Sequence, residues 1–222
     1  MSEWRAETSF KGRVGILGGS FDPIHAGHIQ KVMDVRATLE LRRVLLVPAW
    51  VAPYKLGGAK ASAADRLRMV ELAVSGQDGL EACDYEVRQE AVSYTIDTIE
   101  ALMAVVGRPV LLVGADAYPT LPTWRWYQDL LRLADVAVMT RAGFSMPPPD
   151  DVFSAPTIWS SIGSNIWSHE GGLIVFVTTP DVDVSSTEVR RRIAADESLD
   201  GLVAPEVVSY IQKKGLYQKE KP

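Results

Sequence analysis

The sequence predicts an α/β protein built on a doubly wound, largely parallel sheet. Short apolar runs rich in β-branched residues alternate along the chain with segments of helical spacing. The runs are apolar almost throughout, which is typical of strands buried on both faces under helices. Right-handed crossovers between such strands then give the doubly wound arrangement.

Each element can be placed from its own pattern. The predicted strands are short and apolar: residues 14–17, 44–47, 110–113, 136–139 and 173–177. The predicted helices carry apolar residues three and four positions apart: residues 29–41, 63–75, 96–106, 127–133, 187–195 and 205–213. Residues 49–61 and 143–172 have no such pattern and are expected to be irregular loops, the second long enough to suggest a function of its own.

Length and composition narrow the class of protein further. The 222 residues suit a single domain, with its core at 10–200 and a C-terminal helix and tail at 201–222. A net charge of -5 gives no indication of nucleic-acid binding. The only cysteine, Cys83, excludes an intrachain disulfide and fits a reducing compartment. No apolar run approaches the ~18 residues of a membrane span, and the first residues are too polar for a signal peptide, so we expect a cytoplasmic protein without membrane contact.

The most informative segment is residues 18–28, Gly-Gly-Ser-Phe-Asp-Pro-Ile-His-Ala-Gly-His, between the first predicted strand and helix. Gly18 and Gly19 can adopt backbone angles closed to other residues and let an anion approach the main chain. The helix N-terminus adds unpaired N–H groups and a partial positive charge. His25 and His28 are expected on one face, where both could donate to the same anion. The segment therefore predicts a phosphate-binding turn at the carboxyl end of a strand.

Other interpretations of this segment are weaker. Zinc needs three or four ligands, and the remaining candidates, His169 and Cys83, lie far away in the sequence. The segment lacks the Gly-Lys-Ser/Thr of a P-loop and does not follow the Gly-x-Gly-x-x-Gly dinucleotide pattern.

A second anion site is indicated by residues 184–190, Val-Ser-Ser-Thr-Glu-Val-Arg. Ser185 and Glu188 have the spacing of a capping box, so we expect a helix to begin there. The three arginines 190–192 follow near the positive end of that helix, an unfavourable place for cations unless an anion is bound. A solvated basic face is the alternative.

Two further segments could hold a flat ring and a ribose. In residues 93–98, Thr95 is expected to cap a helix and Asp97 to lie in its first turn. Asp116 follows a strand, where a carboxylate can hold ribose hydroxyls or cap the next helix. Trp124 could stack on a ring or belong to the core.

These motifs together resemble one known family. The run from Gly18 to His28 closely resembles the first motif of the His-x-Gly-His nucleotidyltransferases, and within them that of the bacterial nicotinate-nucleotide adenylyltransferases. Residues 185–190 resemble the family's Ser-Ser-Thr-x-x-Arg motif, which holds the triphosphate of ATP. Residues 94–98 are similar to its Tyr-Thr-x-Asp-Thr motif near the pyridine ring, and Asp116 and Trp124 match its Gly-x-Asp and the tryptophan that follows.

The resemblance implies a Rossmann-like single nucleotidyltransferase domain that transfers an adenylyl group from ATP to nicotinate mononucleotide, with Mg²⁺ carried by the triphosphate and no metal held by the protein. It implies catalytic roles for His25, His28, Lys55 and Arg190. The residues implied to bind ATP are Gly18, Gly19, Ser20, Phe21, His25, His28, Ser185, Ser186, Thr187 and Arg190. Those implied to bind the mononucleotide are Ser20, Tyr94, Thr95, Asp97, Asp116 and Trp124.

The sequence also departs from the family. Residues 48–55 resemble a Pro-Asn-x-x-Pro-Pro-His-Lys stretch, but Ala49 and Tyr54 replace the Asn and the His, while Lys55 is kept. Nicotinamide mononucleotide, phosphopantetheine and a non-catalytic nucleotide-binding regulatory module therefore stay as alternatives, and a homo-oligomer stays open. Arg66 fits a recurrent family helix but reads as well as a surface charge. Arg125 follows Trp124, where some relatives carry a tyrosine.

Overall fold

The computed structural model describes residues 9–53, 58–143, 146–153, 159–169 and 171–218, and it confirms the α/β fold class. In the described residues the strands are β1 (Val14–Gly19), β2 (Arg43–Pro48), β3 (Leu80–Ala82), β4 (Val110–Gly114), β5 (Asp135–Arg141), β6 (Ser160–Gly163), β7 (Ile166–His169) and β8 (Gly172–Thr179). The helices are α2 (Ala26–Thr38), α3 (Ala63–Val74), α4 (Tyr85–Gln89), α5 (Thr95–Val106), the 3-10 helix η1 (Tyr118–Thr123), α6 (Tyr127–Leu133), α7 (Pro149–Val152), α8 (Ser186–Ala194) and α9 (Pro205–Lys214). None of the helices in these ranges is both long and apolar enough to cross a membrane.

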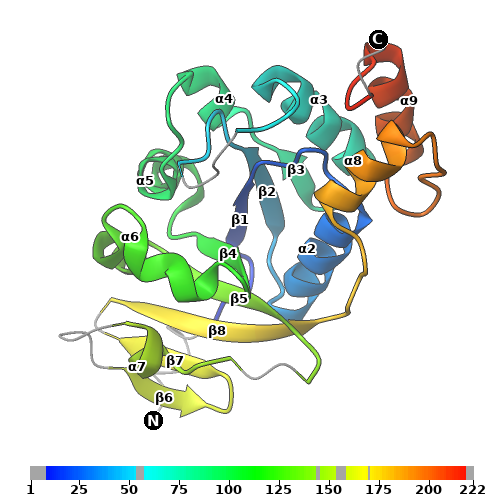
Figure 1. Cartoon of the computed structure of the whole chain (residues 1–222). Helices are drawn as coiled ribbons and strands as arrows, with labels where there is room; N and C mark the ends of the chain where they lie inside the picture. Colours follow the sequence, from blue (N-terminus) through cyan, green and yellow to red (C-terminus); the bar gives the residue numbers. More distant parts are fainter. Residues whose placement is uncertain (1–8, 54–57, 144–145, 154–158, 170, 219–222) are drawn as a thin grey trace. The chain divides into compact units, whose positions relative to one another are not determined.

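The strands are hydrogen-bonded in the order β3-β2-β1-β4-β5-β8-β7-β6. The pairs β1–β4, β4–β5 and β5–β8 are parallel, as the apolar runs predicted. The pairs β8–β7 and β7–β6 are antiparallel, so the sheet is mixed at this edge (Figure 1).

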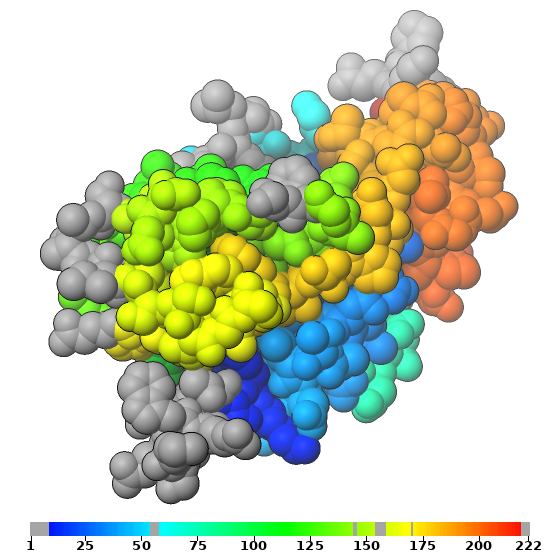
Figure 2. Space-filling model, turned by 90° about the horizontal axis from the view of Figure 1, so that it is seen from below, coloured from blue at the N-terminus to red at the C-terminus, as the bar shows by residue number. Residues whose placement is uncertain are grey.

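The expectation of an irregular loop over residues 143–172 is wrong for part of that stretch. It contains the short helix α7 and the hairpin of β6 and β7. All four residues of β6 are exposed and those of β7 are half-buried, so the hairpin shows none of the apolar runs that mark the central strands. In Figure 2 its residues contribute to the yellow surface of the molecule. The hairpin is held by antiparallel pairing of β7 with β8, so its strands depend on their neighbours in the sheet rather than on an apolar pattern of their own.

Contacts between residues divide the chain into two compact units. The first contains the described residues up to Leu17, Asp34–Val44 and Tyr94–Pro180. Its core is the apolar interior of β4, β5 and β8, with side chains that are at most 3% exposed: Val110, Leu111, Leu112, Val113, Val136, Ala137, Val138, Ile174, Val175 and Val177.

The second unit contains Gly18–Met33, Leu45–Ser93 and the described residues from Asp181 onward. Helix α9 packs against α3 in this unit (Figure 1), and the Tyr210 hydroxyl on α9 donates to the Asp65 carboxylate on α3 over 2.8 Å. Apolar side chains of both helices, Met69, Val70, Val207 and Ile211, are buried.

Candidate active site

Residues 18–25 comprise the last two residues of β1 and the connection to α2, and they are called the phosphate loop here. A Cβ added to Gly18 would meet nothing within 4 Å, so the space beside this backbone is open. A Cβ on Gly19 would lie 3.0 Å from the ring of Phe21. The expectation of special backbone angles at the two glycines is wrong, because the left-handed residue of the loop is Phe21, with φ 47. Gly18 and Gly19 leave room rather than make the turn.

Helix α2 begins directly after His25, three residues earlier than predicted, and its first turn contains His28. The two imidazole rings stack with centroids 3.7 Å apart, which confirms that the histidines share one face. The backbone N–H of His25 donates to Nδ1 of His28 over 3.2 Å. Since Nδ1 accepts this bond, the ring proton of a neutral His28 lies on Nε2. His28 therefore caps α2 with one nitrogen and carries its donor on the other.

The glycine of His25-Ala-Gly-His28 is needed for close approach. A Cβ on Gly27 would lie 3.0 Å from Cγ1 of Val184 and 3.2 Å from Nδ1 of His25. Contacts tighter than 3.4 Å force neighbours to move. The absence of a side chain at Gly27 thus lets the start of α2 lie against the residues that lead into α8.

His25 is buried, with 8% of its surface exposed, and its Nδ1 makes no hydrogen bond in the described structure. Burial lowers the pKa of His25 to about 4, with a smaller contribution from the charge of Lys31. His25 is therefore neutral at pH 7 in the free protein. Among the residues that the structure describes, no three or more His, Cys, Asp or Glu side chains cluster in a way that could hold a metal ion.

The start of α8 carries the predicted second anion site. Ser185 caps the helix, accepting from the backbone N–H of Glu188 over 3.1 Å. The capping box is only half formed, since the Glu188 carboxylate accepts hydrogen bonds from Arg191 and Arg192. These ion pairs hold the pKa of Glu188 well below its usual range, at about 2. Arg191 and Arg192 are thus paired with Glu188. Arg190, the one arginine that the family motif assigns to ATP, instead donates to the phosphate loop.

Hydrogen bonds join α8 to the phosphate loop within the second unit. The Ser186 hydroxyl donates to the carbonyl of Pro23 over 2.9 Å. One Arg190 nitrogen donates to the carbonyl of Asp22, and the other donates to the Thr187 hydroxyl over 3.2 Å. The structure thus brings together the two motifs that the sequence separates by about 160 residues.

For Arg66 the sequence left two interpretations open, a residue of a family helix or a surface charge, and the structure decides between them. Arg66 is 2% exposed, and its guanidinium donates to the carbonyls of Ser20, Ala49, Trp50 and Ala61. The alternative of a surface charge is thereby excluded. Arg66 follows Ala63 and precedes Met69 by three residues each, so helical spacing on the buried face of α3 was the signal available in the sequence.

The residues predicted to bind the mononucleotide lie in the first unit, apart from Ser20, which belongs to the phosphate loop. Tyr94 precedes α5, so Thr95 is the first helical residue and the prediction that it caps the helix is wrong by one position. Asp97 lies in the first turn, as predicted. Asp116 follows β4, and its Oδ1 lies 2.6 Å from where a Cβ of Gly114 would be, so Gly114 makes room for this carboxylate.

Trp124 is half-buried, and its Nε1 donates to the Thr120 hydroxyl over 3.2 Å. The next residue, Arg125, lies between two rings: its guanidinium carbon is 4.6 Å from the centroid of Tyr94 and 4.2 Å from that of Trp126. Cation–π contacts with these two rings restrict where the guanidinium of Arg125 can lie.

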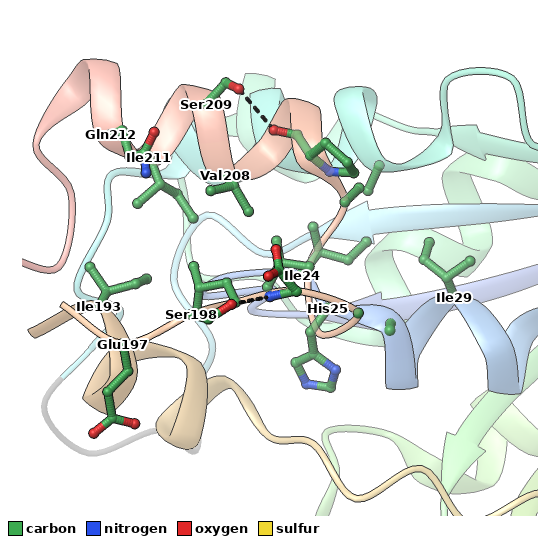
Figure 3. Close-up of a pocket in the computed structure, with 18 of the residues that line it drawn as sticks. Ile24, His25, Ile29, Ile193, Glu197, Ser198, Val208, Ser209, Ile211 and Gln212 are labelled. Atoms are coloured by element: carbon green, nitrogen blue, oxygen red, sulfur yellow. Dashed lines mark hydrogen bonds between the residues drawn. The ribbon is translucent and has the colours of Figure 1, made fainter. Parts of the chain in front are cut away.

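Figure 3 shows a cavity of about 820 Å³ in the second unit, with His25 at its edge. Its lining comes from α2, α3, α9 and the chain that follows α8, and includes the acidic residues Asp196, Glu197 and Asp200. Asp196 and Asp200 in this lining disfavour a triphosphate, the Glu197 carboxylate being paired with Arg191, and the imidazole of His25 points away from the α9 side of this space (Figure 3). The cavity is therefore a poor candidate for the ATP site. Lys55 lies outside the described residues.

The chain is similar to several known proteins. A cytidylyltransferase-like family model matches residues 16–192. The curated "Probable nicotinate-nucleotide adenylyltransferase" of Desulfatibacillum aliphaticivorans is 35% identical, covering 92% of this chain and 99% of the relative. The protein of the same name from Chromobacterium violaceum is 37% identical, covering 93% and 99%. A solved structure, Plasmodium falciparum nicotinic acid mononucleotide adenylyltransferase complexed with NaAD, shares the fold with a TM-score of 0.69 at 16% identity, covering 92% of this chain and 97% of that one.

The family match and the two relatives identify the class. The chain belongs to the cytidylyltransferase-like family of nucleotidyltransferases and, within it, to the nicotinate-nucleotide adenylyltransferases.

Proposed function

We propose that the chain transfers an adenylyl group from ATP to nicotinate mononucleotide, giving deamido-NAD and pyrophosphate, as a step of NAD biosynthesis. The observation that carries the proposal is the assembly in the second unit, where the phosphate loop, the His25–His28 pair, the start of α8 and Arg190 are joined by hydrogen bonds. Helix N-termini, ring N–H groups and a guanidinium together suit a triphosphate. The names of the curated relatives support the choice of acceptor.

In this reaction an oxygen of the mononucleotide 5′-phosphate attacks the α-phosphorus of ATP. The bond from that phosphorus to the oxygen bridging to the β-phosphate breaks, and pyrophosphate leaves with the electron pair. The chain need supply no covalent nucleophile, so its task is to align two anions and stabilise the charge that builds on the leaving group. We assign this charge stabilisation to the Nε2–H of His28, to Arg190 and Lys55, and to the N–H groups at the starts of α2 and α8.

His25 contributes in a different way, because it is neutral in the free protein. A phosphate beside its ring favours the imidazolium, so nucleotide binding is expected to raise the pKa of His25 and draw a proton onto it. The buried position of His25 strengthens this interaction, since little water screens it.

Nucleotidyltransferases of this kind generally use a divalent metal with ATP, and we propose Mg²⁺ as part of the ATP complex. The Asp22 carboxylate of the phosphate loop accepts from the backbone N–H groups of Lys60 and Ala61 and from the hydroxyl of Tyr217. These bonds occupy most of the acceptor sites of the Asp22 carboxylate, which makes it a poor candidate for a metal ligand. This arrangement fits a Mg²⁺ ion held by phosphate oxygens and water, with the protein binding the phosphates.

The stacked Arg125 supports an acidic rather than an amide substituent on the pyridine ring. Its guanidinium lies over Tyr94, one of the residues expected near that ring, and a guanidinium can bind a carboxylate through charge-assisted hydrogen bonds. A neutral carboxamide would lose the charge-assisted part of this interaction. With ATP as the second substrate, we place the reaction in the cytoplasm.

The test is pyrophosphate release from ATP with nicotinate mononucleotide and, in parallel, with nicotinamide mononucleotide. We expect a higher kcat/KM for the nicotinate form. Arg125→Gln should lower that value by about 10- to 100-fold, the worth of one hydrogen bond to a charged group, and leave turnover of the amide unchanged. Equal turnover of both mononucleotides would refute the assignment of acceptor. ATP binding without release of pyrophosphate in either reaction would favour a non-catalytic nucleotide-binding module.

A further inference from the structure

Asp22 is the point at which four parts of the second unit meet. Its side chain is buried, with 8% of it exposed. Oδ2 accepts from the backbone N–H of Lys60 over 2.7 Å and Oδ1 from that of Ala61 over 3.0 Å. Oδ1 also accepts from the Tyr217 hydroxyl over 2.8 Å, and Oδ2 lies 3.8 Å from an Arg190 nitrogen. The phosphate loop is thereby connected to the residues before α3, to the segment after α9 and to α8.

Tyr217 reaches this position at a conformational cost. It follows Gly215, which ends α9, and has φ 63, in the left-handed region that a tyrosine seldom adopts. Burial and the bond to the Asp22 carboxylate raise the pKa of the Tyr217 phenol far above its usual value. The phenol therefore stays protonated and remains a hydrogen-bond donor to Asp22 at any physiological pH.

Arg190 is oriented by the same aspartate. One of its nitrogens donates to the backbone carbonyl of Asp22 and lies near the Asp22 carboxylate, while the other donates to Thr187 on its own helix. A long side chain that is 27% exposed would otherwise lose conformational entropy when it binds a phosphate. Fixing Asp22 thus fixes where the guanidinium of Arg190 lies before nucleotide arrives.

We propose that Tyr217 is a positioning residue for the ATP site: its hydroxyl holds Asp22, and Asp22 holds Arg190 and the phosphate loop in the geometry that binds the triphosphate. This deepens the proposed function and rests on it for the role of Arg190. The segment after α9 then belongs to the nucleotide-binding machinery, although no family motif in the sequence assigned it such a role.

The experiment compares two tyrosines that make the same bond in different places. Tyr217→Phe removes the hydroxyl on Asp22 and keeps the ring. Tyr210→Phe removes the hydroxyl that donates to Asp65 over 2.8 Å, from the neighbouring helix α9 and away from the phosphate loop. Affinity for Mg·ATP alone is measured by titration calorimetry, so the result does not depend on the acceptor. Pyrophosphate release reports the proposed function separately.

We expect Tyr217→Phe to raise the Kd for Mg·ATP about tenfold, the lower end for one hydrogen bond to a charged group, and to leave the KM for the mononucleotide unchanged. Tyr210→Phe should leave both constants unchanged. In an Arg190→Ala background the Tyr217→Phe change should have a smaller effect than in the wild-type protein, because the part that passes through Arg190 is already lost. Equal effects of the two tyrosine variants, additivity with Arg190→Ala, or an unfolded Tyr217→Phe protein would each overturn the proposal and leave Tyr217 a structural residue.

Discussion

The imidazole of His28 has two functions that belong to different nitrogens. Nδ1 caps α2, and Nε2 carries the donor that we assign to the phosphates. His28→Ala removes both. His28→Asn keeps an acceptor near the place of Nδ1 and removes the Nε2 donor. We expect both variants to lose about 10²- to 10³-fold in turnover, as on removal of a charge-stabilising donor. Only His28→Ala should also lose about 1 kcal/mol of stability, the value of a helix cap.

These two effects are separated by measuring pyrophosphate release and thermal unfolding on the same preparations. Wild-type turnover of His28→Asn would show that Nε2 does not act on the reacting phosphates.

A side chain at Gly18 should affect ATP binding without destabilising the free protein. Its backbone angles suit any residue, and a Cβ there would meet no protein atom within 4 Å. Gly18→Ala should therefore leave stability unchanged or raise it by about 0.4–1 kcal/mol through the unfolded chain. If the open space is where the phosphates lie, the methyl group should weaken ATP binding by tenfold or more. The affinity of Gly18→Ala and of the wild-type protein for ATP is measured by titration calorimetry. Unchanged ATP affinity would place the phosphates elsewhere.

At single positions, the sequence predicts features that depend on residues a few positions away. It does not predict features that depend on distant segments of the chain. The shared face of His25 and His28 and the cap by Ser185 follow from spacing, and both are confirmed. The depressed pKa of His25 depends on burial by distant segments, which spacing does not reveal. The partners of Asp22 are equally remote, since Tyr217 lies 195 residues away.

Helix α3 presents one arginine to the interior and another to solvent, which gives a matched pair of substitutions. Arg66→Met should destabilise the protein by about 3 kcal/mol, because it removes the buried donor to four carbonyls that shape the ends of β1 and β2. Arg68, half exposed and paired with Glu71, is the control, and Arg68→Met should change stability by less than about 0.5 kcal/mol. Urea unfolding of both variants measures the difference. Equal stabilities would show that water replaces the guanidinium without cost.

Long elements were predicted well, and short ones were missed. Helices α3 and α9 begin where the pattern placed them, because amphipathic spacing over several turns is a strong local signal. Strand β3, helix α4 and the β6–β7 hairpin were not predicted. They are three to five residues long and depend on their neighbours for stability. Helix α2 begins early because His28 caps it through a side-chain bond that no capping motif announces.

For the protein as a whole, His25 links folding to pH. Its pKa is about 4 in the folded state against about 6.5 when unfolded, so below pH 6.5 the unfolded chain binds the extra proton. The contribution of His25 to stability is complete above pH 6.5 and is lost as the pH falls towards 4. Its full size is about 3 kcal/mol, from 1.36 kcal/mol per pKa unit.

We expect His25→Gln to flatten the decline of stability between pH 6.5 and 4, measured by urea unfolding at several pH values. A decline of unchanged steepness in the variant would assign it to other titrating groups. Nucleotide should oppose the decline in the wild-type protein, because a bound phosphate favours the protonated ring.

The bond from Ser186 to Pro23 spans 163 residues, and that from Arg190 to Asp22 spans 168. Closing loops of this length costs chain entropy that is regained only after the intervening segments have condensed. The geometry that binds nucleotide is therefore among the last to form when the chain folds. A fluorescent ATP analogue added during refolding would report completion of the native state, and its signal would lag behind the appearance of helical structure.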